Sequence, residues 1–314
     1  MDKTITLSVV ASVYNEEKNI GEFYSQVSEI AEKLIKEGNS FEVIFVDDGS
    51  TDDSYKQIAE IKKSSEYVKI LRLSRNFGHE AAMLAGIDKA KGAAIICMDS
   101  DLQHPPECIF DMLAAYNAGY DIVNMVRDGY GKKISITKRV MSFLFYKLIN
   151  FIAAVKIEES ASDFFLVSNR AAHVLRNEYR EQSRFLRGFI QIMGFKKTVL
   201  KFKINKRFGG ESKYSIKKLF SLSKSAIISF SNVPLRAGIL AGGITGLIGI
   251  GVAVYSLVVK LSRGAPPGYT TIVILLCVLF SINFFVLGVI GEYIGHMLYE
   301  VKKRPLYIID EFIE

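Results

Sequence analysis

The sequence predicts an α/β domain built on a mostly parallel sheet, followed by two apolar helices. Short apolar runs alternate with amphipathic helical segments in the N-terminal part of the chain, which is the pattern of a doubly wound sheet. Acidic turns follow two of these runs, at the sheet edge where open α/β sheets bind their ligands. Two long apolar stretches near the C-terminal end are typical of membrane-spanning helices.

The first four strands are expected where apolar and β-branched residues are concentrated. They cover Leu7 to Val13, Glu42 to Val46, Lys69 to Leu73 and Ala93 to Cys97. Amphipathic helices follow the first three strands and end near Glu37, Ser64 and Ala90. The chain has no Gly-x-Gly-x-x-Gly motif after the first strand and no Walker-type loop, which argues against dinucleotide-binding and P-loop sites.

The most informative stretch is Met98 to Glu107, MDSDLQHPPE, which follows the fourth strand. Asp99 and Asp101 are separated by one residue, so an extended backbone would direct both carboxylates to the same side. With Gln103 they form a set of hard oxygen ligands that suits Mg²⁺ or Mn²⁺. The alternative is an acidic turn that caps the helix expected near Pro106.

Composition separates this chain from ordinary soluble enzymes. Of its 314 residues 49% are hydrophobic, and the mean hydropathy is +0.21. The net charge is +7, and basic clusters beside the apolar stretches suit anionic lipid headgroups. No nucleic-acid partner is expected, because the basic residues are not interleaved with aromatic ones. The three cysteines have no metal-binding spacing, and their odd number argues against a disulfide framework.

The two apolar stretches, Ala237 to Val259 and Thr270 to Ile294, each approach the roughly 20 residues that cross a bilayer core. Their short connection carries only Lys260 and Arg263, whereas Lys and Arg are numerous beyond the outer ends. The positive-inside rule therefore predicts a multi-pass protein of the cell membrane, with the α/β domain and both termini cytoplasmic. An N-terminus that enters a strand without a signal-peptide pattern gives the same expectation.

The chain is expected to divide into four parts. Residues 1–212 form the α/β domain, 213–234 a basic amphipathic interfacial segment, 235–296 the helical hairpin and 297–314 a cytoplasmic tail. Another basic amphipathic segment, 129–155, is expected either at the membrane interface or as a core-facing helix. A homo-oligomer is compatible with the glycines that recur every fourth residue at Gly238, Gly242 and Gly246.

A family resemblance is carried by five motifs, which occur in the order VVASVYNEE, VDDGSTD, RNFGHEAAMLAG, DSDLQHPPE and RFGGESKYS. Together they resemble family 2 glycosyltransferases of the polyprenyl-phosphate type, which have a GT-A fold with a Rossmann-like, mostly parallel sheet. The bactoprenol glucosyltransferases are similar over essentially the whole chain, and the dolichyl-phosphate mannose synthases more distantly. One departure is Ser12, where the family usually has proline; it is expected to loosen the following turn slightly.

The resemblance implies a nucleotide site. Tyr14, Glu16 and Asp48 would hold the base and ribose, since an aromatic ring stacks on a base and a carboxylate accepts its N–H. Asp99 would approach the nucleotide-sugar. Asp47 stands beside Asp48 in the same motif, but it can equally be a turn residue that caps the following helix.

The resemblance also implies a metal and a catalytic carboxylate. Asp101 and Gln103, with Asp99 beside them, would anchor Mg²⁺ or Mn²⁺ on the diphosphate. Asp163 matches the position of the proposed catalytic base of the family. His79 and His104 stand next to expected helix starts, where histidines are usually structural, so neither is expected to take part in catalysis.

The RFGGESKY motif is expected to bind phosphate. Its glycines allow close approach of the backbone, Arg207 can form two parallel hydrogen bonds to phosphate oxygens, and Ser212 and Lys213 add donors. This motif precedes the expected interfacial segment, so the phosphate would be that of a lipid. The alternative is a basic loop that faces anionic lipid.

These observations predict an inverting, metal-dependent glycosyltransferase that moves a sugar from a nucleotide-sugar donor onto polyprenyl phosphate, for cell-envelope glycosylation. UDP-glucose is the first expectation for the donor and UDP-N-acetylglucosamine the second. A processive polysaccharide synthase is the alternative within this class, but its Gln-x-x-Arg-Trp motif is absent from a chain without tryptophan. A non-catalytic membrane component is the alternative from another class.

Overall fold

The computed structural model describes residues 6–128, 161–182, 185–203, 233–263 and 268–314. These residues belong to two compact units, Met1–Lys218 with Arg304–Glu314, and Leu219–Lys303. The segment 129–155 and nearly all of 213–234 lie outside the described residues, so their expected membrane-interface roles stay predictions.

Four parallel strands form the centre of the sheet in the first unit. They are β1 (Leu7–Val13), β2 (Phe41–Asp47), β3 (Val68–Leu73) and β4 (Ala94–Asp99). Nearly all their side chains are buried, as expected for strands of a parallel sheet covered on both faces. The pairing order is β4-β1-β2-β3, so the carboxyl ends of all four strands meet at one edge. This confirms the four strands expected from the sequence.

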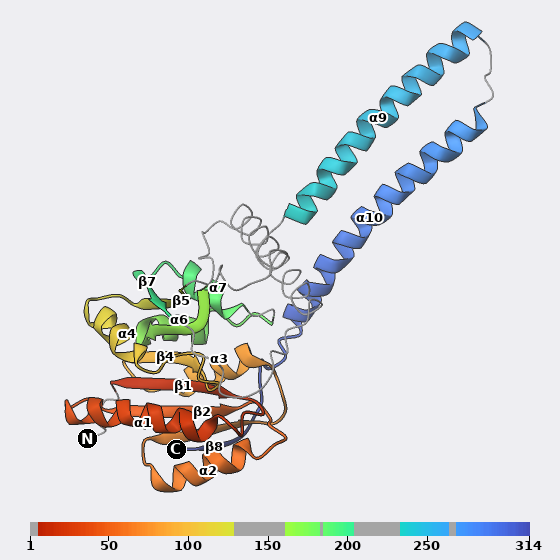
Figure 1. Cartoon of the computed structure of the whole chain (residues 1–314). Coiled ribbons are helices and arrows are strands. Elements are labelled where there is room, and N and C mark those ends of the chain that lie inside the picture. Colours follow the sequence, from red (N-terminus) through yellow and green to blue (C-terminus); the bar gives the residue numbers. More distant parts are fainter. Residues whose placement is uncertain (1–5, 129–160, 183–184, 204–232, 264–267) are drawn as a thin grey trace. The chain divides into compact units, whose positions relative to one another are not determined.

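Four further strands extend the sheet on both sides. They are β5 (Ile122–Arg127), β6 (Ala161–Ser168), β7 (Lys197–Phe202) and β8 (Ile309–Ile313). Over the described residues the order is β7-β5-β6-β4-β1-β2-β3-β8 (Figure 1). Strand β6 is antiparallel to β4 and β5, and β8 is antiparallel to β3, whereas β7 is parallel to β5.

Helices cover both faces of this sheet. Those of the described part of the first unit are α1 (Ile20–Lys36), α2 (Ser54–Ser64), α3 (His79–Lys89), α4 (Cys108–Asn117), α6 (Asn169–Asn177) and α7 (Leu186–Ile192). On one face, Phe23 of α1 and Ile58 of α2 are fully buried in the main hydrophobic cluster. On the other, α3 approaches β1 so closely that a Cβ on Gly86 would lie 2.2 Å from Val10 Cγ1. The helices expected before the second, third and fourth strands are thereby confirmed.

The chain end is part of the first unit. The sequence predicts a tail at 297–314, whereas the structure places β8 at the edge of the sheet beside β3. Just before β8, the Tyr307 hydroxyl donates to Asp88 of α3, which also pairs with Arg180 at 2.9 Å. An edge strand with charged residues has no strong sequence signal, and its partner β3 is far away in the chain. This explains why the periodicity did not indicate it.

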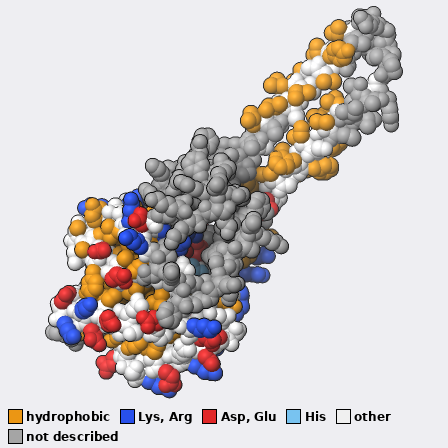
Figure 2. Space-filling view, in the orientation of Figure 1, with side chains coloured by type: hydrophobic (Ala, Val, Ile, Leu, Met, Phe, Trp, Pro, Cys, Tyr) orange, Lys and Arg blue, Asp and Glu red, His pale blue; other side chains and the backbone are white. Residues whose placement is uncertain are grey.

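The second unit contains two long helices over its described residues, α9 (Val233–Arg263) and α10 (Tyr269–Val301). They contact one another, and a Cβ on Gly238 of α9 would lie 3.6 Å from Val286 of α10. Figure 2 shows hydrophobic side chains along both helices. Val278–Val301 is long and apolar enough to cross a membrane, by length and composition, whereas the apolar stretch described in α9, Gly242–Val252, is shorter. The two expected helices are confirmed as helices.

Candidate active site

The loops that follow β1 and β2 are hydrogen-bonded to each other. Asn15, with a φ of 55°, accepts the backbone N–H of Thr51 at 2.8 Å, and its own N–H donates to Ser50 Oγ at 3.1 Å. The backbone N–H of Glu16 donates to Ser54 Oγ at 2.9 Å. These bonds join the YNEE and DDGST motifs into one hydrogen-bonded loop pair at the carboxyl edge of the sheet. Tyr14 is 42% exposed, and its stacking on a nucleotide base stays a prediction.

Asp48 connects this loop pair to the start of α3. Its two carboxylate oxygens accept the backbone N–H groups of Phe77 at 2.7 Å and Gly78 at 2.9 Å. Burial raises the pKa of Asp48, although both hydrogen bonds oppose that shift. The structure thus shows a role in loop positioning that the sequence did not indicate, and nucleotide binding by Asp48 stays a prediction. Asp47 accepts the N–H of Ser50 at 3.0 Å, which makes it a turn residue.

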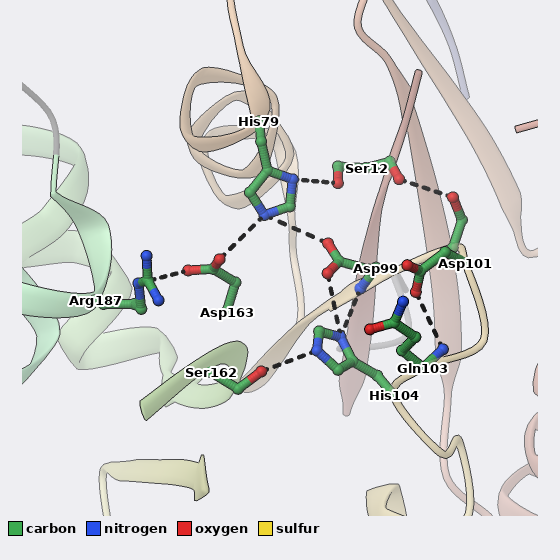
Figure 3. A network of polar contacts seen from close by, with 10 residues as sticks. Ser12, His79, Asp99, Asp101, Gln103, His104, Ser162, Asp163 and Arg187 are labelled. Carbon is green, nitrogen blue, oxygen red and sulfur yellow. Dashed lines mark hydrogen bonds and ion pairs between the residues drawn. The ribbon is translucent and has the colours of Figure 1, made fainter. Parts of the chain in front are cut away.

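The turn after β4 carries the expected metal ligands. Because the strand ends at Asp99 and Leu102 has a φ of 64°, the alternation of an extended strand does not set the direction of Asp101. Instead, Asp101 Oδ1 accepts the backbone N–H of Gln103 at 3.1 Å, which folds the turn on itself. Figure 3 shows all three side chains on this turn. Asp99, Asp101 and Gln103 are therefore neighbours because of a turn rather than a strand.

His104 holds this turn in place. The backbone N–H of Asp99 donates to His104 Nδ1 at 3.0 Å, so the ring proton must be on Nε2, which lies 2.9 Å from Ser162 Oγ. The ring stacks on Phe164 with centroids 4.9 Å apart, and burial lowers the pKa of His104. A neutral, buried ring with both nitrogens bonded is structural, as expected from the sequence.

Antiparallel pairing brings Asp163 to Asp99. Cys97 of β4 pairs with Phe165 of β6, and continuing this antiparallel register sets Asp99, two residues later in β4, opposite Asp163, two residues earlier in β6. Asp163 Oδ1 lies 3.1 Å from Nε of Arg187, which is in the first turn of α7. The predicted catalytic carboxylate thus faces the predicted donor carboxylate and is paired with a cation.

His79 lies between these two carboxylates, a place that its position at an expected helix start did not indicate (Figure 3). Its Nε2 is 3.4 Å from Asp99 Oδ1 and 3.7 Å from Asp163 Oδ2. Burial would lower the pKa of His79, but Asp99, Asp163 and Glu80 outweigh burial and raise it. The available signal was its place in the RNFGHE motif, directly at a strand-to-helix turn on the ligand-binding edge.

The electrostatics of Asp99 follow from these neighbours. Burial would raise the pKa of Asp99, but the positive charges of His79, Arg127 and Arg187 outweigh it and lower the pKa. Asp99 is therefore held as a carboxylate. Arg207, Ser212 and Lys213 lie outside the described residues, so their expected phosphate binding stays a prediction.

Comparison with known proteins shows the family. The sequence model of Glycosyl transferase family 2 matches residues 8–209. The chain belongs to glycosyltransferase family 2. It is 36% identical over 316 residues to the uncharacterized glycosyltransferase YkcC of Bacillus subtilis, covering 99% of this chain and 95% of that protein. It is 34% identical over 304 residues to the SfII prophage-derived bactoprenol glucosyl transferase of Shigella flexneri, covering 96% and 97%.

A solved structure is also similar to this family 2 glycosyltransferase. It is TarS 1–349 of S. aureus in complex with UDP-GlcNAc, with a TM-score of 0.47 and 18% identity, covering 73% of this chain and 68% of that chain. The family match and the mostly parallel sheet together confirm the expected GT-A fold, and the bactoprenol relatives confirm the resemblance on which it was based.

Proposed function

We propose that this glycosyltransferase moves a sugar from a nucleotide-sugar onto polyprenyl phosphate at the cytoplasmic leaflet of the cell membrane. The observation that carries the proposal is the meeting of Asp99 and Asp163 at the carboxyl edge of the sheet, where their strands β4 and β6 pair. Asp99 belongs to the motif assigned to the donor, and Asp163 is the residue assigned to the acceptor. A relative named bactoprenol glucosyl transferase, which matches over 96% of this chain, supports the lipid acceptor.

The donor would bind across the loop pair after β1 and β2. Tyr14 would stack on the base, and Glu16 and Asp48 would accept its polar hydrogens. UDP-glucose is the first candidate, because relatives are named as glucosyl transferases, and UDP-N-acetylglucosamine is the second. The acceptor oxygen would attack the anomeric carbon as the bond to the diphosphate breaks, which inverts the configuration and releases the nucleoside diphosphate.

The turn after β4 fits a divalent metal. Among the described residues no group of three Asp, Glu, His or Cys side chains could hold a metal alone. Mg²⁺ usually takes only one or two protein carboxylates and completes its coordination with water and substrate phosphates. Asp99 and Asp101, with the amide oxygen of Gln103, are such a partial set and would hold Mg²⁺ or Mn²⁺. When bound, the metal would neutralise charge on the leaving diphosphate.

The acceptor side would combine phosphate binding with membrane anchoring. Arg207, Ser212 and Lys213 would bind the lipid phosphate, and Asp163 would orient it. Helices α9 and α10 would cross the bilayer as a hairpin and keep both termini in the cytoplasm. The apolar segment Val278–Val301 supports association with a membrane, and the distribution of Lys and Arg is the reason for the proposed orientation. The Gly238 to Gly246 spacing would suit a homo-oligomer.

A donor screen tests this function. Full-length protein in nanodiscs would be incubated with undecaprenyl phosphate, Mg²⁺ and one labelled nucleotide-sugar at a time, and lipid-linked label would be measured. We expect transfer from UDP-glucose, which is lost with EDTA and in Asp101→Ala. Asp111→Ala, on the exposed face of α4, is the matched control and should keep activity.

Each alternative has its own outcome in this screen. Label in long polymers would favour a processive synthase. Nucleotide binding without transfer from any donor would favour a non-catalytic membrane component. Full activity of Asp101→Ala in EDTA would refute the metal requirement.

A further inference from the structure

Ser12 has a defined place in the candidate active site, although the sequence suggested only a loosened turn. It lies in β1 next to Asp99 of β4 in the parallel register. Its carbonyl oxygen accepts the hydroxyl of Ser100 at 2.9 Å, and its own Oγ lies 2.9 Å from His79 Nδ1. A proline at position 12 would have no hydroxyl and could not make the second contact.

The contact with Ser12 orients the imidazole of His79. Once Nδ1 is held by Ser12, the ring geometry fixes the direction in which Nε2 points. Nε2 is buried and has no hydrogen-bond partner. It lies 3.4 Å from Asp99 Oδ1 and 3.7 Å from Asp163 Oδ2. A lone pair on Nε2 would face two carboxylates and be repelled. Nε2 therefore carries a hydrogen in either charge state of the ring, and it directs that hydrogen between the two acids.

We propose that Ser12 and His79 form a positioning couple that holds Asp99 and Asp163 in their relative places for sugar transfer. Both carboxylates are negative and face one another across β4 and β6, so a donor between them offsets their repulsion and restricts their rotamers. Ser12 acts through His79, and His79 acts through the two acids, so both are positioning residues. The assignment of the acids to donor and acceptor depends on the proposed function, whereas the orientation of the ring does not.

Activity measurements test the couple with paired variants. Ser12→Ala removes the hydroxyl, and Ser12→Thr keeps it on a residue that suits a strand. For Ser12→Ala we expect kcat to fall about tenfold with little change in the KM for the nucleotide-sugar, the size typical of a lost orienting partner. Ser12→Thr should restore most of kcat. His173→Gln, an exposed histidine of α6, is the matched control.

A substrate-free measurement separates the couple from the proposed function. The chain has four histidines, so the imidazole nitrogens of full-length protein labelled with ¹⁵N-histidine can be resolved, with His79→Gln as the assignment control. Ser12→Ala should shift the Nδ1 signal of His79, and Ser12→Thr should return it.

The outcomes are distinct. An unshifted Nδ1 signal in Ser12→Ala, or a shifted signal with unchanged kcat, would overturn the positioning couple. An equal fall of kcat in Ser12→Thr and Ser12→Ala would also overturn it, because the hydroxyl would then be irrelevant. Absence of transfer by the wild type with every donor would overturn the proposed function instead, while the NMR comparison still decides whether Ser12 orients the ring.

Discussion

Arg187 Nε lies 3.1 Å from Asp163 Oδ1, so the carboxylate expected to act as the catalytic base already has a cationic partner. His79 approaches its other oxygen at 3.7 Å. A carboxylate engaged on both sides is better suited to orienting a substrate than to removing a strongly held proton. The proposed acceptor, polyprenyl phosphate, hardly needs a base to remove a proton. The second pKa of a phosphate monoester is about 6, so most acceptor molecules are dianionic at neutral pH.

We therefore expect Asp163→Asn to bind nucleotide normally but to lose most turnover. Its residual rate should rise with pH through the second pKa of the acceptor, about 6, because above it no proton remains to be removed. The measurement is a pH–rate profile of the variant relative to the wild type. A residual rate that does not rise across this range would contradict attack by a dianionic acceptor that needs no base, and wild-type turnover would show that Asp163 is dispensable.

The raised pKa of Glu80, next to His79, predicts that the stability of the folded protein depends on pH. Burial, with a smaller contribution from Asp163, raises the pKa of Glu80 from 4.5 to about 7. The folded protein therefore favours the protonated carboxyl. Its stability contribution is fully present below the unfolded pKa of 4.5 and is lost as the pH rises through about 7.

Glu80→Gln should remove this dependence, because an amide resembles the protonated acid at every pH. At about pH 8 the variant should be more stable than the wild type, by up to about 3 kcal/mol at 1.36 kcal/mol per pKa unit. At about pH 5 the difference should be small. Thermal unfolding at both pH values measures it, with Glu29→Gln on an exposed face of α1 as control. A difference that is larger at the lower pH would contradict the sign.

The parts of the fold that the sequence predicts well are those with local signals. Strands β1 to β4 are short runs rich in apolar and β-branched residues that end in turn residues, and their positions follow from the pattern to within two residues. Strand β8 depends on an edge of β3 that is distant in the chain, and no local periodicity encodes that pairing.

The residues of the candidate site also differ in whether a local motif or long-range packing brings them together. Asp99, Asp101 and Gln103 lie together in a short motif, so their proximity could be predicted, although the reason is a turn rather than strand alternation. Asp163 was identified only by family resemblance, because its place opposite Asp99 depends on the register of β6. His79 lies near both carboxylates because α3 packs against the sheet, and no local pattern encodes that packing.

The C-terminal residues should stabilise the first unit through Tyr307. Its hydroxyl donates to Asp88, and burial raises the pKa of Tyr307 well above its usual value. Tyr307→Phe would remove a hydrogen bond to a charged group, which typically contributes about 1.5–3 kcal/mol. We expect a lower melting temperature and faster proteolytic release of the C-terminal end. Tyr299→Phe, which is 53% exposed, is the control, and equal effects of the two variants would contradict the role of the Asp88 contact.

Two glycines in helices should respond in opposite directions to alanine. In α1, a Cβ on Gly21 would meet nothing within 4 Å, so Gly21→Ala should stabilise the protein by about 0.5–1 kcal/mol through improved helix propensity. In α3, a Cβ on Gly86 would lie 2.2 Å from Val10 Cγ1 and 3.0 Å from Val46 Cγ2. Both valines are in the buried sheet and cannot move aside, so Gly86→Ala should destabilise by about 1–3 kcal/mol.

The Gly86→Ala variant should also lose activity at temperatures where it remains folded. Pushing α3 away from the sheet displaces its first residue, His79, from Asp99 and Asp163, and small displacements of positioning groups cost large factors in rate. The comparison is kcat and melting temperature for Gly86→Ala and Gly21→Ala in the same nanodiscs. If Gly86→Ala unfolds at a lower temperature but keeps full kcat when folded, the closeness of α3 to the sheet matters for stability and not for the placement of His79.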